Sequence, residues 1–192
     1  MNKPQLFVLV GGNGAGKSTF FQQFLKAKDL PFVNADLIAK EFYHDNAEAR
    51  SYDAAMLAAQ QRKILLTQKQ SFCFETVFSH PSKVDFLADA IAMGYEVLLI
   101  GIFLDSIELN AARVCHRVAC GGHTVPENKI LRRIPRTIEN IKLAIPLVSE
   151  TWLIDNSSIT KPFKHTLRFK QGRLVYRSED LPDWTNSFIA LN

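Results

Sequence analysis

The chain has 192 residues, of which 47% are hydrophobic, and it carries a formal net charge of +4 at pH 7. This length and apolar content suit one domain spanning residues 1–192 with a sizeable core, and the charge fits an anionic ligand but is too small to indicate nucleic acid. No apolar run reaches the roughly twenty residues of a membrane-spanning helix, and three cysteines in a chain that needs no disulfides favour a reducing compartment, so we expect a soluble cytoplasmic protein without a membrane partner.

The first predicted elements are a strand over residues 6–10 and a helix that begins near Lys17, with a glycine-rich turn between them. Gly11, Gly16, Lys17 and Ser18 fill the pattern GxxxxGK[ST], in which backbone N–H groups surround phosphate, the lysine neutralises it and the hydroxyl can ligate Mg²⁺. A plain strand-capping turn is the alternative, but the flanking strand and helix favour phosphate binding. The predicted nucleotide-binding residues are Gly11, Gly12, Asn13, Gly14, Ala15, Gly16, Lys17, Ser18 and Thr19, with Ser18 as the metal ligand.

Further predicted strands alternate with helical patterns along the chain. They cover residues 31–34, 71–76, 94–105 and 151–155. This alternation, with long continuous apolar runs, predicts an α/β fold with a doubly wound parallel five-stranded sheet covered by helices on both faces. The basic segment 161–177 is predicted to contain a β-hairpin, at about 163–177, that turns near Gln171 and Gly172. We interpret it as an appendage to the core.

Polar side chains follow three of the predicted strands, at the edge of a parallel sheet where ligands collect. Asp36 follows the second strand, Glu75 and Thr76 end the third, and Asp105 ends the fourth. Each carboxylate has a structural alternative: Asp36 could cap the next helix, Glu75 could be a partnered edge carboxylate, and Asp105 could start a helix. Because phosphoryl transfer needs a base and oxygen ligands for Mg²⁺, their convergence beside the glycine-rich turn favours a functional role for Asp36.

The segment 111–136 supplies positive charge and is predicted to form a helical lid. Its pattern is a helix, a loop with Gly121 and Gly122, and a second helix whose capping box would pair Thr124 with Glu127. Pro135 should break or kink that second helix. Guanidinium groups on such a lid can stabilise charge on a transferring phosphoryl group, whereas the structural alternative is a solvated basic face. The candidate arginines, in no assigned order, are Arg117, Arg132, Arg133 and Arg136, with Arg113 one turn before Arg117.

A zinc site in the same segment is the less favoured interpretation. Cys115, His116, Cys120 and His123 fall within nine residues, but no CxxC pair occurs and the adjacent Cys115 and His116 would point to different faces of a helix. His123 is kept as a candidate phosphate contact.

Five stretches together resemble the zeta-toxin-like P-loop kinases, which are related in fold to shikimate and adenylate kinases. These stretches are GNGAGKST, NAD, FET, GGHTVPENKILRRIPR and DNSS, and they run across most of the chain. The resemblance implies that Asp36 acts as base toward a sugar hydroxyl, that Glu75 and Thr76 contact the substrate, and that lid arginines engage ATP phosphates. The best-described members phosphorylate UDP-N-acetylglucosamine, but this chain reads ETVFS where those toxins have a glutamate-glycine-threonine segment. The resemblance also implies an antitoxin-like protein as a partner. Toxicity does not follow from the motif.

The sequence therefore favours a Mg²⁺-dependent ATP kinase that acts on a hydroxyl of a small molecule, such as a nucleotide sugar. Its predicted catalytic residues are Asp36, Lys17, Arg117, Arg132, Arg133 and Arg136. A nucleotide-dependent ATPase or switch acting on a protein partner is the first alternative, although the base-reading pattern NKxD of GTPases is absent. The second is a nucleic-acid 5′-hydroxyl kinase, for which the basic hairpin offers Phe169 and Tyr176. Because amphipathic core strands explain these two aromatics equally well, a nucleic-acid partner is not expected.

Overall fold

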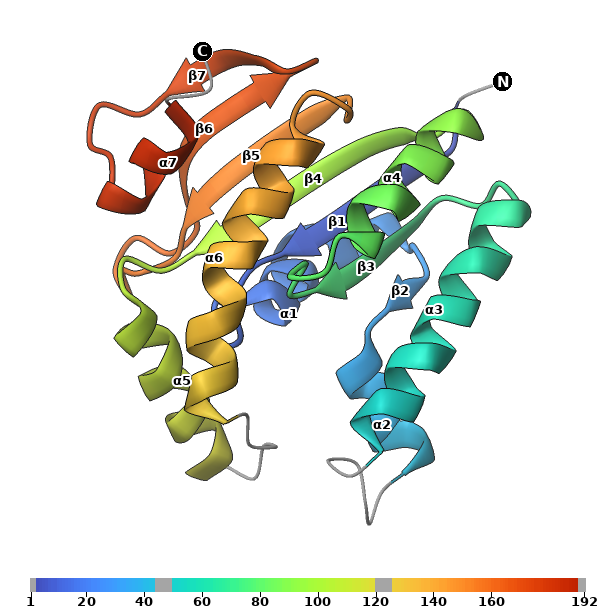
Figure 1. The fold of residues 1–192 in the computed structure, drawn as a ribbon, viewed down its shortest axis with the longest axis horizontal. Helices are drawn as coiled ribbons and strands as arrows, with labels where there is room; N and C mark the ends of the chain where they lie inside the picture. The colour runs from blue at the N-terminus through green and yellow to red at the C-terminus, as the bar shows by residue number, and fades with distance from the viewer. Residues whose placement is uncertain (1–2, 44–49, 120–125, 190–192) are drawn as a thin grey trace.

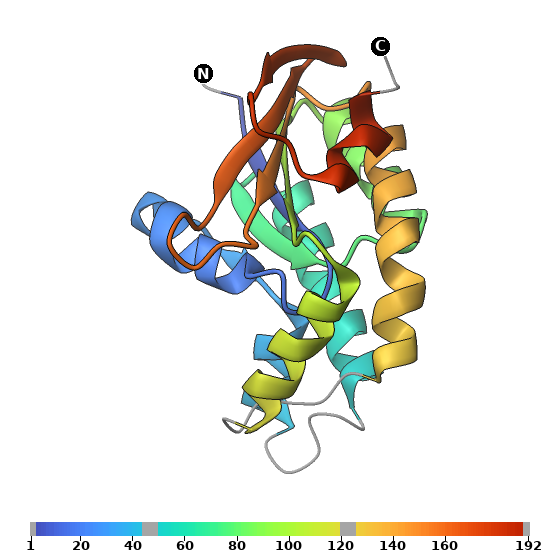
Figure 2. The ribbon, with the colours of Figure 1, turned by 90° about the vertical axis from the view of Figure 1, so that its left-hand side faces the viewer.

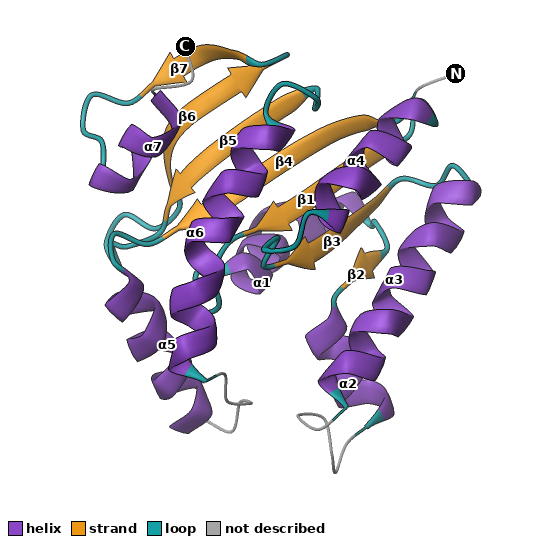
Figure 3. Ribbon diagram, in the orientation of Figure 1, coloured by secondary structure: helices purple, strands orange, loops and turns teal. Residues whose placement is uncertain are grey.

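The computed structural model describes residues 3–43, 50–119 and 126–189, which form an α/β fold around a seven-stranded sheet (Figures 1 and 3). The strands are β1 (Gln5–Val10), β2 (Phe32–Val33), β3 (Phe72–Thr76), β4 (Glu96–Phe103), β5 (Glu150–Asp155), β6 (Lys164–Lys170) and β7 (Arg173–Arg177). The helical elements are α1 (Lys17–Phe20), the π-helical turn η1 (Phe21–Leu25), the 3-10 turn η2 (Lys26–Lys28), α2 (Ala35–Phe42), α3 (Ser51–Thr67), α4 (Ser82–Ala92), α5 (Ile107–Ala119), α6 (Glu127–Ala144), η3 (Asp183–Thr185) and α7 (Asn186–Ile189).

The strand order is β2-β3-β1-β4-β5-β6-β7, in which the first five strands are parallel and the last two are antiparallel to their neighbours. The five predicted strands are confirmed. The prediction that the hairpin is an appendage is wrong, because β6 pairs along the whole of β5 and the hairpin thereby extends the same sheet. Its turn is where we expected it: Gln171 and Gly172 have φ of 49° and 78°, the left-handed conformations that a two-residue hairpin turn of this kind requires.

The core consists of two apolar clusters, one on each face of the sheet. The larger cluster joins the sheet to α3, α4, α6 and α7, through residues such as Leu66, Leu87 and Ile141. The smaller one joins the sheet to α1 and η1, through Phe20, Phe21 and Leu25. Figure 2 shows α1 on one side of the sheet and α6 on the other. Within the described residues, the second face is therefore covered mainly by the single helical segment 17–28.

The parallel strands direct the predicted site residues to one edge of the sheet. Residues 6–10 of β1 are fully or almost fully buried, as expected for a strand with helices on both faces. Since β3, β1 and β4 are adjacent and parallel, the residues that follow them emerge side by side. At this edge α2 and α3 extend beyond the strands on one side, and α5 and α6 extend on the other (Figure 1).

Helix α6 passes through Pro135 without interruption, so the predicted break there is wrong. A proline inside a helix removes one backbone hydrogen bond and costs about 3 kcal/mol. Contacts that follow the proline offset this cost: Thr137 donates to the carbonyl oxygen of Val77, Asn140 donates to that of Phe78, and Ile141 is fully buried. The helix begins at Glu127, whereas Gly121, Gly122, His123 and Thr124 lie outside the described residues.

Candidate active site

The glycine-rich turn, residues 11–16, connects the central strand β1 to α1. Gly14 and Gly16 have φ of 80° and 99°, conformations that residues with a Cβ adopt rarely. A Cβ on Gly16 would also lie 2.4 Å from Nδ2 of Asn156, and one on Gly14 would lie 2.7 Å from the carbonyl oxygen of Asn110. Both glycines are therefore required by the backbone and by the neighbours that hold the turn.

Lys17 and Ser18 both contact the carboxylate of Glu75. Lys17 is buried, with 6% of its surface exposed, and its Nζ donates to the carbonyl oxygen of Gly12 at 2.9 Å. The same Nζ lies 3.7 Å from Oε1 of Glu75, and the Ser18 hydroxyl donates to Oε2 of Glu75 at 2.6 Å. The turn thus presents an ammonium and a hydroxyl to one anionic group. This donor set fits a phosphate, and the Ser18 hydroxyl beside a carboxylate fits Mg²⁺.

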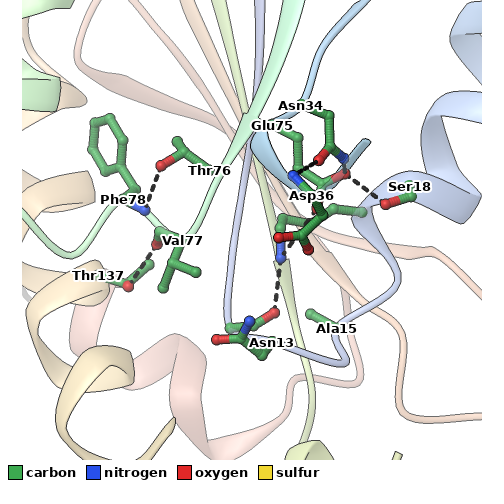
Figure 4. Close-up of polar contacts among 12 residues, drawn as sticks. Asn13, Ala15, Ser18, Asn34, Asp36, Glu75, Thr76, Val77, Phe78 and Thr137 are labelled. Atoms are coloured by element: carbon green, nitrogen blue, oxygen red, sulfur yellow. Dashed lines mark hydrogen bonds and ion pairs between the residues drawn. The ribbon is translucent and has the colours of Figure 1, made fainter. Parts of the chain in front are cut away.

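Asn34 connects Glu75 to the start of α2, where Asp36 lies (Figure 4). Its Oδ1 accepts from the backbone N–H groups of Asp36 and Leu37, at 2.8 and 3.3 Å, and its Nδ2 donates to Oε2 of Glu75 at 2.8 Å. The alternative in which Asp36 caps this helix is therefore wrong, because Asn34 is the cap. Asp36 occupies the first turn with an exposed side chain. A carboxylate there is stabilised by the N-terminal end of the helix dipole.

The chain that leaves β3 is fixed by α6. The Thr76 hydroxyl oxygen accepts from the backbone N–H of Phe78 at 3.1 Å, and buried Phe78 has a φ of 66°. Thr137 of α6 donates to the carbonyl oxygen of Val77 at 2.7 Å (Figure 4), and Asn140 donates to that of Phe78 at 2.8 Å. A non-glycine residue in this conformation is strained and needs such support. The segment next to Glu75 is thereby coupled to the helix that carries three of the candidate arginines.

Asp105 lies apart from the other two carboxylates. It follows β4, on the opposite side of β1 from β3, and its backbone N–H donates to the Ser157 hydroxyl oxygen at 2.7 Å. It lines a cavity of about 330 Å³ together with Gly12, Asn110 and Trp184. It does not start α5 either, because Ser106 accepts from the backbone N–H of Leu109 at 3.2 Å. The predicted convergence of three carboxylates is reduced to Asp36 and Glu75.

The candidate arginines differ in their exposure. Arg132 and Arg136 are exposed, whereas Arg133 and Arg117 are half-buried. Arg133 lies four residues before Thr137 and therefore shares the face of α6 that contacts Val77. Cys115 and His116 are exposed on α5, and Cys120 and His123 lie outside the described residues.

Three residues that fix the phosphate turn were not among the predicted site residues. Asn110 of α5 donates to the carbonyl oxygen of Asn13 at 2.7 Å, and Asn156 donates to that of Ala15 at 2.8 Å. Arg113 donates to the carbonyl oxygen of Ser157 at 3.4 Å, and its Cβ lies beside Gly14. The DNSS stretch was a usable signal for Asn156, but Asn110 lies within an ordinary amphipathic helix pattern and carries no local signal.

Burial shifts the pKa values of two side chains at β3, the Cys73 thiol within the strand and the Arg62 guanidinium of α3 packed against it. Desolvation raises the pKa of the Cys73 thiol, and the nearby Glu75 carboxylate adds to this shift, so the thiol stays protonated and unreactive. Desolvation lowers the pKa of Arg62 to about 10, and this buried guanidinium packs on the rings of Phe74 and Phe86. Arg62 remains charged at neutral pH. A buried positive charge therefore lies against Phe74 of β3, next to Glu75 in the sequence.

The zeta toxin family model matches residues 1–166. The chain belongs to the zeta toxin family. Among solved structures, a chain of the AvrRxo1-ORF1:AvrRxo1-ORF2 complex with sulphate ions has a TM-score of 0.73 at 15% identity, and the match covers 98% of this chain and 63% of that one. The PezAT toxin-antitoxin system of Streptococcus pneumoniae has a TM-score of 0.66 at 15% identity, covering 100% of this chain and 79% of that one.

An uncharacterized protein of Haemophilus influenzae is 29% identical over 123 residues, which are 64% of this chain and 87% of that protein. At such identities the solved structures establish the fold, a P-loop kinase-like α/β fold, for this zeta toxin family chain. Within the described ranges, every helix is too short or too polar to span a bilayer.

Proposed function

We propose that this zeta toxin family protein is an ATP-dependent kinase that transfers a phosphoryl group to a hydroxyl of a small molecule. The observation that supports this most strongly is the connection between the phosphate turn and α2, the helix of Asp36. Lys17 and Ser18 contact Glu75. Asn34 in turn donates a hydrogen bond to Glu75 and caps α2. A nucleotide site and an acceptor site are thus built from one set of hydrogen bonds.

In this proposal the turn holds the β and γ phosphates of ATP. The backbone amides of residues 11–19 and the Lys17 ammonium provide positive charge, and Ser18 with Glu75 would hold Mg²⁺. When bound, the ion supplies charge neutralisation between the β and γ phosphates. Because Glu75 contacts both Lys17 and Ser18 in this structure, nucleotide binding must move its carboxylate or place it beside the metal ion.

Asp36 would orient the acceptor hydroxyl and take its proton. The hydroxyl oxygen forms a bond to the γ-phosphorus, the bond from this phosphorus to the β–γ bridging oxygen breaks, and ADP leaves with the bonding electrons. The acceptor proton moves to the carboxylate of Asp36. Support for this role is the position of Asp36, exposed at the first turn of α2 and linked through Asn34 to Glu75.

The arginines of α5 and α6 would stabilise charge on the transferring group. Arg133 is the leading candidate, because it is half-buried on the face of α6 that contacts Val77, next to the Glu75 segment. Arg117 is half-buried one turn beyond Arg113, which packs beside Gly14. Arg132 and Arg136 are exposed and would contribute less.

A nucleotide sugar such as UDP-N-acetylglucosamine is the acceptor that the family favours. Here β3 continues into Val77 and Phe78, which α6 holds in place, rather than into the glycine-threonine of the best-described toxins. The acceptor pocket would therefore have a bulkier wall at this point. We also propose an antitoxin-like protein partner, for which the likeness to the toxin of the PezAT toxin-antitoxin system is the support.

A phosphoryl-transfer screen tests the proposal. Purified protein and γ-labelled ATP are incubated with nucleotide sugars, free sugars and 5′-hydroxyl oligonucleotides, and labelled products are separated. The proposal predicts label on a small-molecule hydroxyl, and on a nucleotide sugar before a free sugar. ATP loss without any labelled acceptor would support an ATPase or switch instead, and labelled oligonucleotide would support a polynucleotide kinase.

A further inference from the structure

The hairpin region carries all of the net positive charge of the chain. Its 17 residues, 161–177, contain six cations and no carboxylate, and the cations are Lys161, Lys164, Arg168, Lys170, Arg173 and Arg177. The remaining 175 residues contain 17 basic and 19 acidic residues, a formal net charge of −2. A charge distribution this uneven indicates a surface that binds a polyanion rather than a general solubilising charge.

Two aromatic side chains and an arginine form a row across the same part of the sheet. Trp152 of β5 is opposite Arg168 of β6, and Arg168 is opposite Tyr176 of β7, so these side chains project from one face. The Arg168 guanidinium lies 6.0 Å from the centre of a Trp152 ring. Tyr176 is 47% exposed, whereas Phe169 is 1% exposed and belongs to the core of the other face. The expectation that both aromatics belong to amphipathic core strands is therefore confirmed for Phe169, which is buried in the core, and is wrong for Tyr176, which is exposed.

A groove of about 480 Å³ adjoins this row. It lies between the helical segment 17–28 and strands β5 and β6, and its lining includes Phe7, Phe24, Trp152, Phe163, His165 and Lys28. Phe24 is 52% exposed, and the Lys28 ammonium lies 5.5 Å from the centre of the Phe7 ring. Aromatic rings line the groove, and Lys28 provides a cation on the side of the helical segment. The hairpin provides further cations on the side of the sheet.

Much of the hairpin charge is available to a ligand. Within the described residues, Lys164 is paired with Asp180 and Arg168 with Glu150, Lys161 and Lys170 lie near enough to these carboxylates to help lower their pKa values, and Arg173 and Arg177 form no ion pair. Basic residues on an edge strand such as β7 also prevent edge-to-edge association of sheets. That protective role does not account for the exposed ring of Tyr176 and the half-buried ring of Trp152 in register with an arginine, or for the aromatic groove beside them.

We propose that this face binds single-stranded nucleic acid. Bases would stack on Trp152 and Tyr176, one base would enter the groove, and Lys170 and Arg173, which are opposite one another on β6 and β7, would contact phosphates. The cations and the stacking residues of this surface belong to β5–β7, and the groove adds Phe7 and Phe24, whereas Lys17, Ser18 and Glu75 of the phosphate site are not among the residues that line it. The binding function is therefore separate from the phosphoryl-transfer site and does not depend on the proposed kinase activity.

Fluorescence anisotropy with labelled 12-nucleotide oligo(dT) and oligo(U) at about 50 mM salt tests the proposal, and the two arms separate DNA from RNA. The proposal predicts binding of at least one oligonucleotide and quenching of tryptophan fluorescence. Tyr176→Ala should weaken binding about fivefold or more, and Tyr176→Phe, which keeps the ring, should bind like the parent. Lys170→Gln/Arg173→Gln should lower the slope of log Kd against log salt by about 1.4, the value for two contacts to single-stranded phosphates.

The matched control is Lys63→Gln/Lys69→Gln, which removes the same charge from the exposed surface of α3 and the residues after it. This control should bind oligonucleotide as the parent does. Absence of binding by the parent, an equal loss in the control, or unchanged binding by Tyr176→Ala would overturn the proposal. Displacement of the oligonucleotide by polyglutamate at equal charge concentration would also overturn it, in favour of a surface for acidic proteins.

Discussion

The two sides of the phosphate turn are built differently. On the side of α2 and β3, Asn34, Asp36, Glu75, Ser18 and Lys17 are joined by hydrogen bonds and one close ion pair, without any ligand. On the side of α5 and α6, the candidate arginines occupy exposed or half-buried positions on two helices. The acceptor side is therefore largely preorganised by the chain itself, whereas the arginine side gathers like charges on two helices.

Charge explains the difference. The acceptor side pairs the Glu75 carboxylate with a cation and with uncharged donors, so Glu75, Lys17 and Asn34 can be largely buried together at a lower cost than unpaired charges. The arginines carry like charge, and burying several of them without an anion would be expensive. We therefore expect the arginines to contact the transferring phosphoryl group only once the nucleotide is bound.

Lys17→Ala should have the largest effect, because Lys17 is the buried cation of the phosphate turn and contacts Glu75. Turnover should fall about a hundred- to thousandfold, as on loss of a preorganised electrostatic contact to the reacting group, and ATP affinity should fall as well. Initial rates and ATP titrations measure the two effects. Lys63→Ala, on the exposed surface of α3, is the control for loss of one lysine. A variant with parental turnover would contradict the assignment of the phosphate turn.

Arg133→Ala should come next, with turnover reduced about tenfold or more and ATP affinity changed less. Arg132→Ala, one residue away but exposed, should lower turnover less than threefold. Arg133→Lys should rescue poorly if the planar guanidinium contacts two phosphate oxygens. Equal effects of the two alanine variants, with full rescue by lysine, would mean that α6 contributes only a diffuse basic surface.

Asn34→Ala should have a smaller effect on turnover and a measurable one on stability. It removes the cap of α2 and the hydrogen bond to Glu75, which together should lower the free energy of unfolding by about 1–3 kcal/mol in a urea titration. Asn34→Asp keeps a capping oxygen but replaces the donor to Glu75 with a second carboxylate. Because two carboxylates facing one another at this buried position repel, the aspartate variant should also be less stable than the parent, and if the link to Glu75 matters for activity it should be about fivefold or more slower. Parental turnover in Asn34→Asp would show that Asn34 is only a helix cap.

The features of this site that depend on neighbouring residues could be predicted from the sequence, whereas contacts between residues far apart in the chain could not. GxxxxGKS, the strands and the polar residues at the strand ends are local signals, and the structure places the turn beside Glu75 and Asp36 but leaves Asp105 apart. Asn34 and Asn110 were missed because their partners lie far along the chain, at Glu75 and Asn13. The predicted break at Pro135 does not occur because the contacts of α6 with Val77 and Phe78 outweigh the local preference of proline. The hairpin was recognised, but a periodic pattern does not indicate which edge of a sheet a hairpin joins.

The most direct test of the central claim, that Asp36 serves the acceptor hydroxyl, is a comparison of Asp36→Asn with the parent in two measurements on the same preparation. ATP affinity with Mg²⁺ should be unchanged, because Lys17, Ser18 and Glu75 remain, and the fold should survive, because Asn34 caps α2. Phosphoryl transfer to the acceptor should be slower by about two to four orders of magnitude, the usual contribution of a general base. Unchanged transfer would contradict the account, and a large loss of Mg²⁺-dependent ATP affinity would assign Asp36 to the metal ion instead.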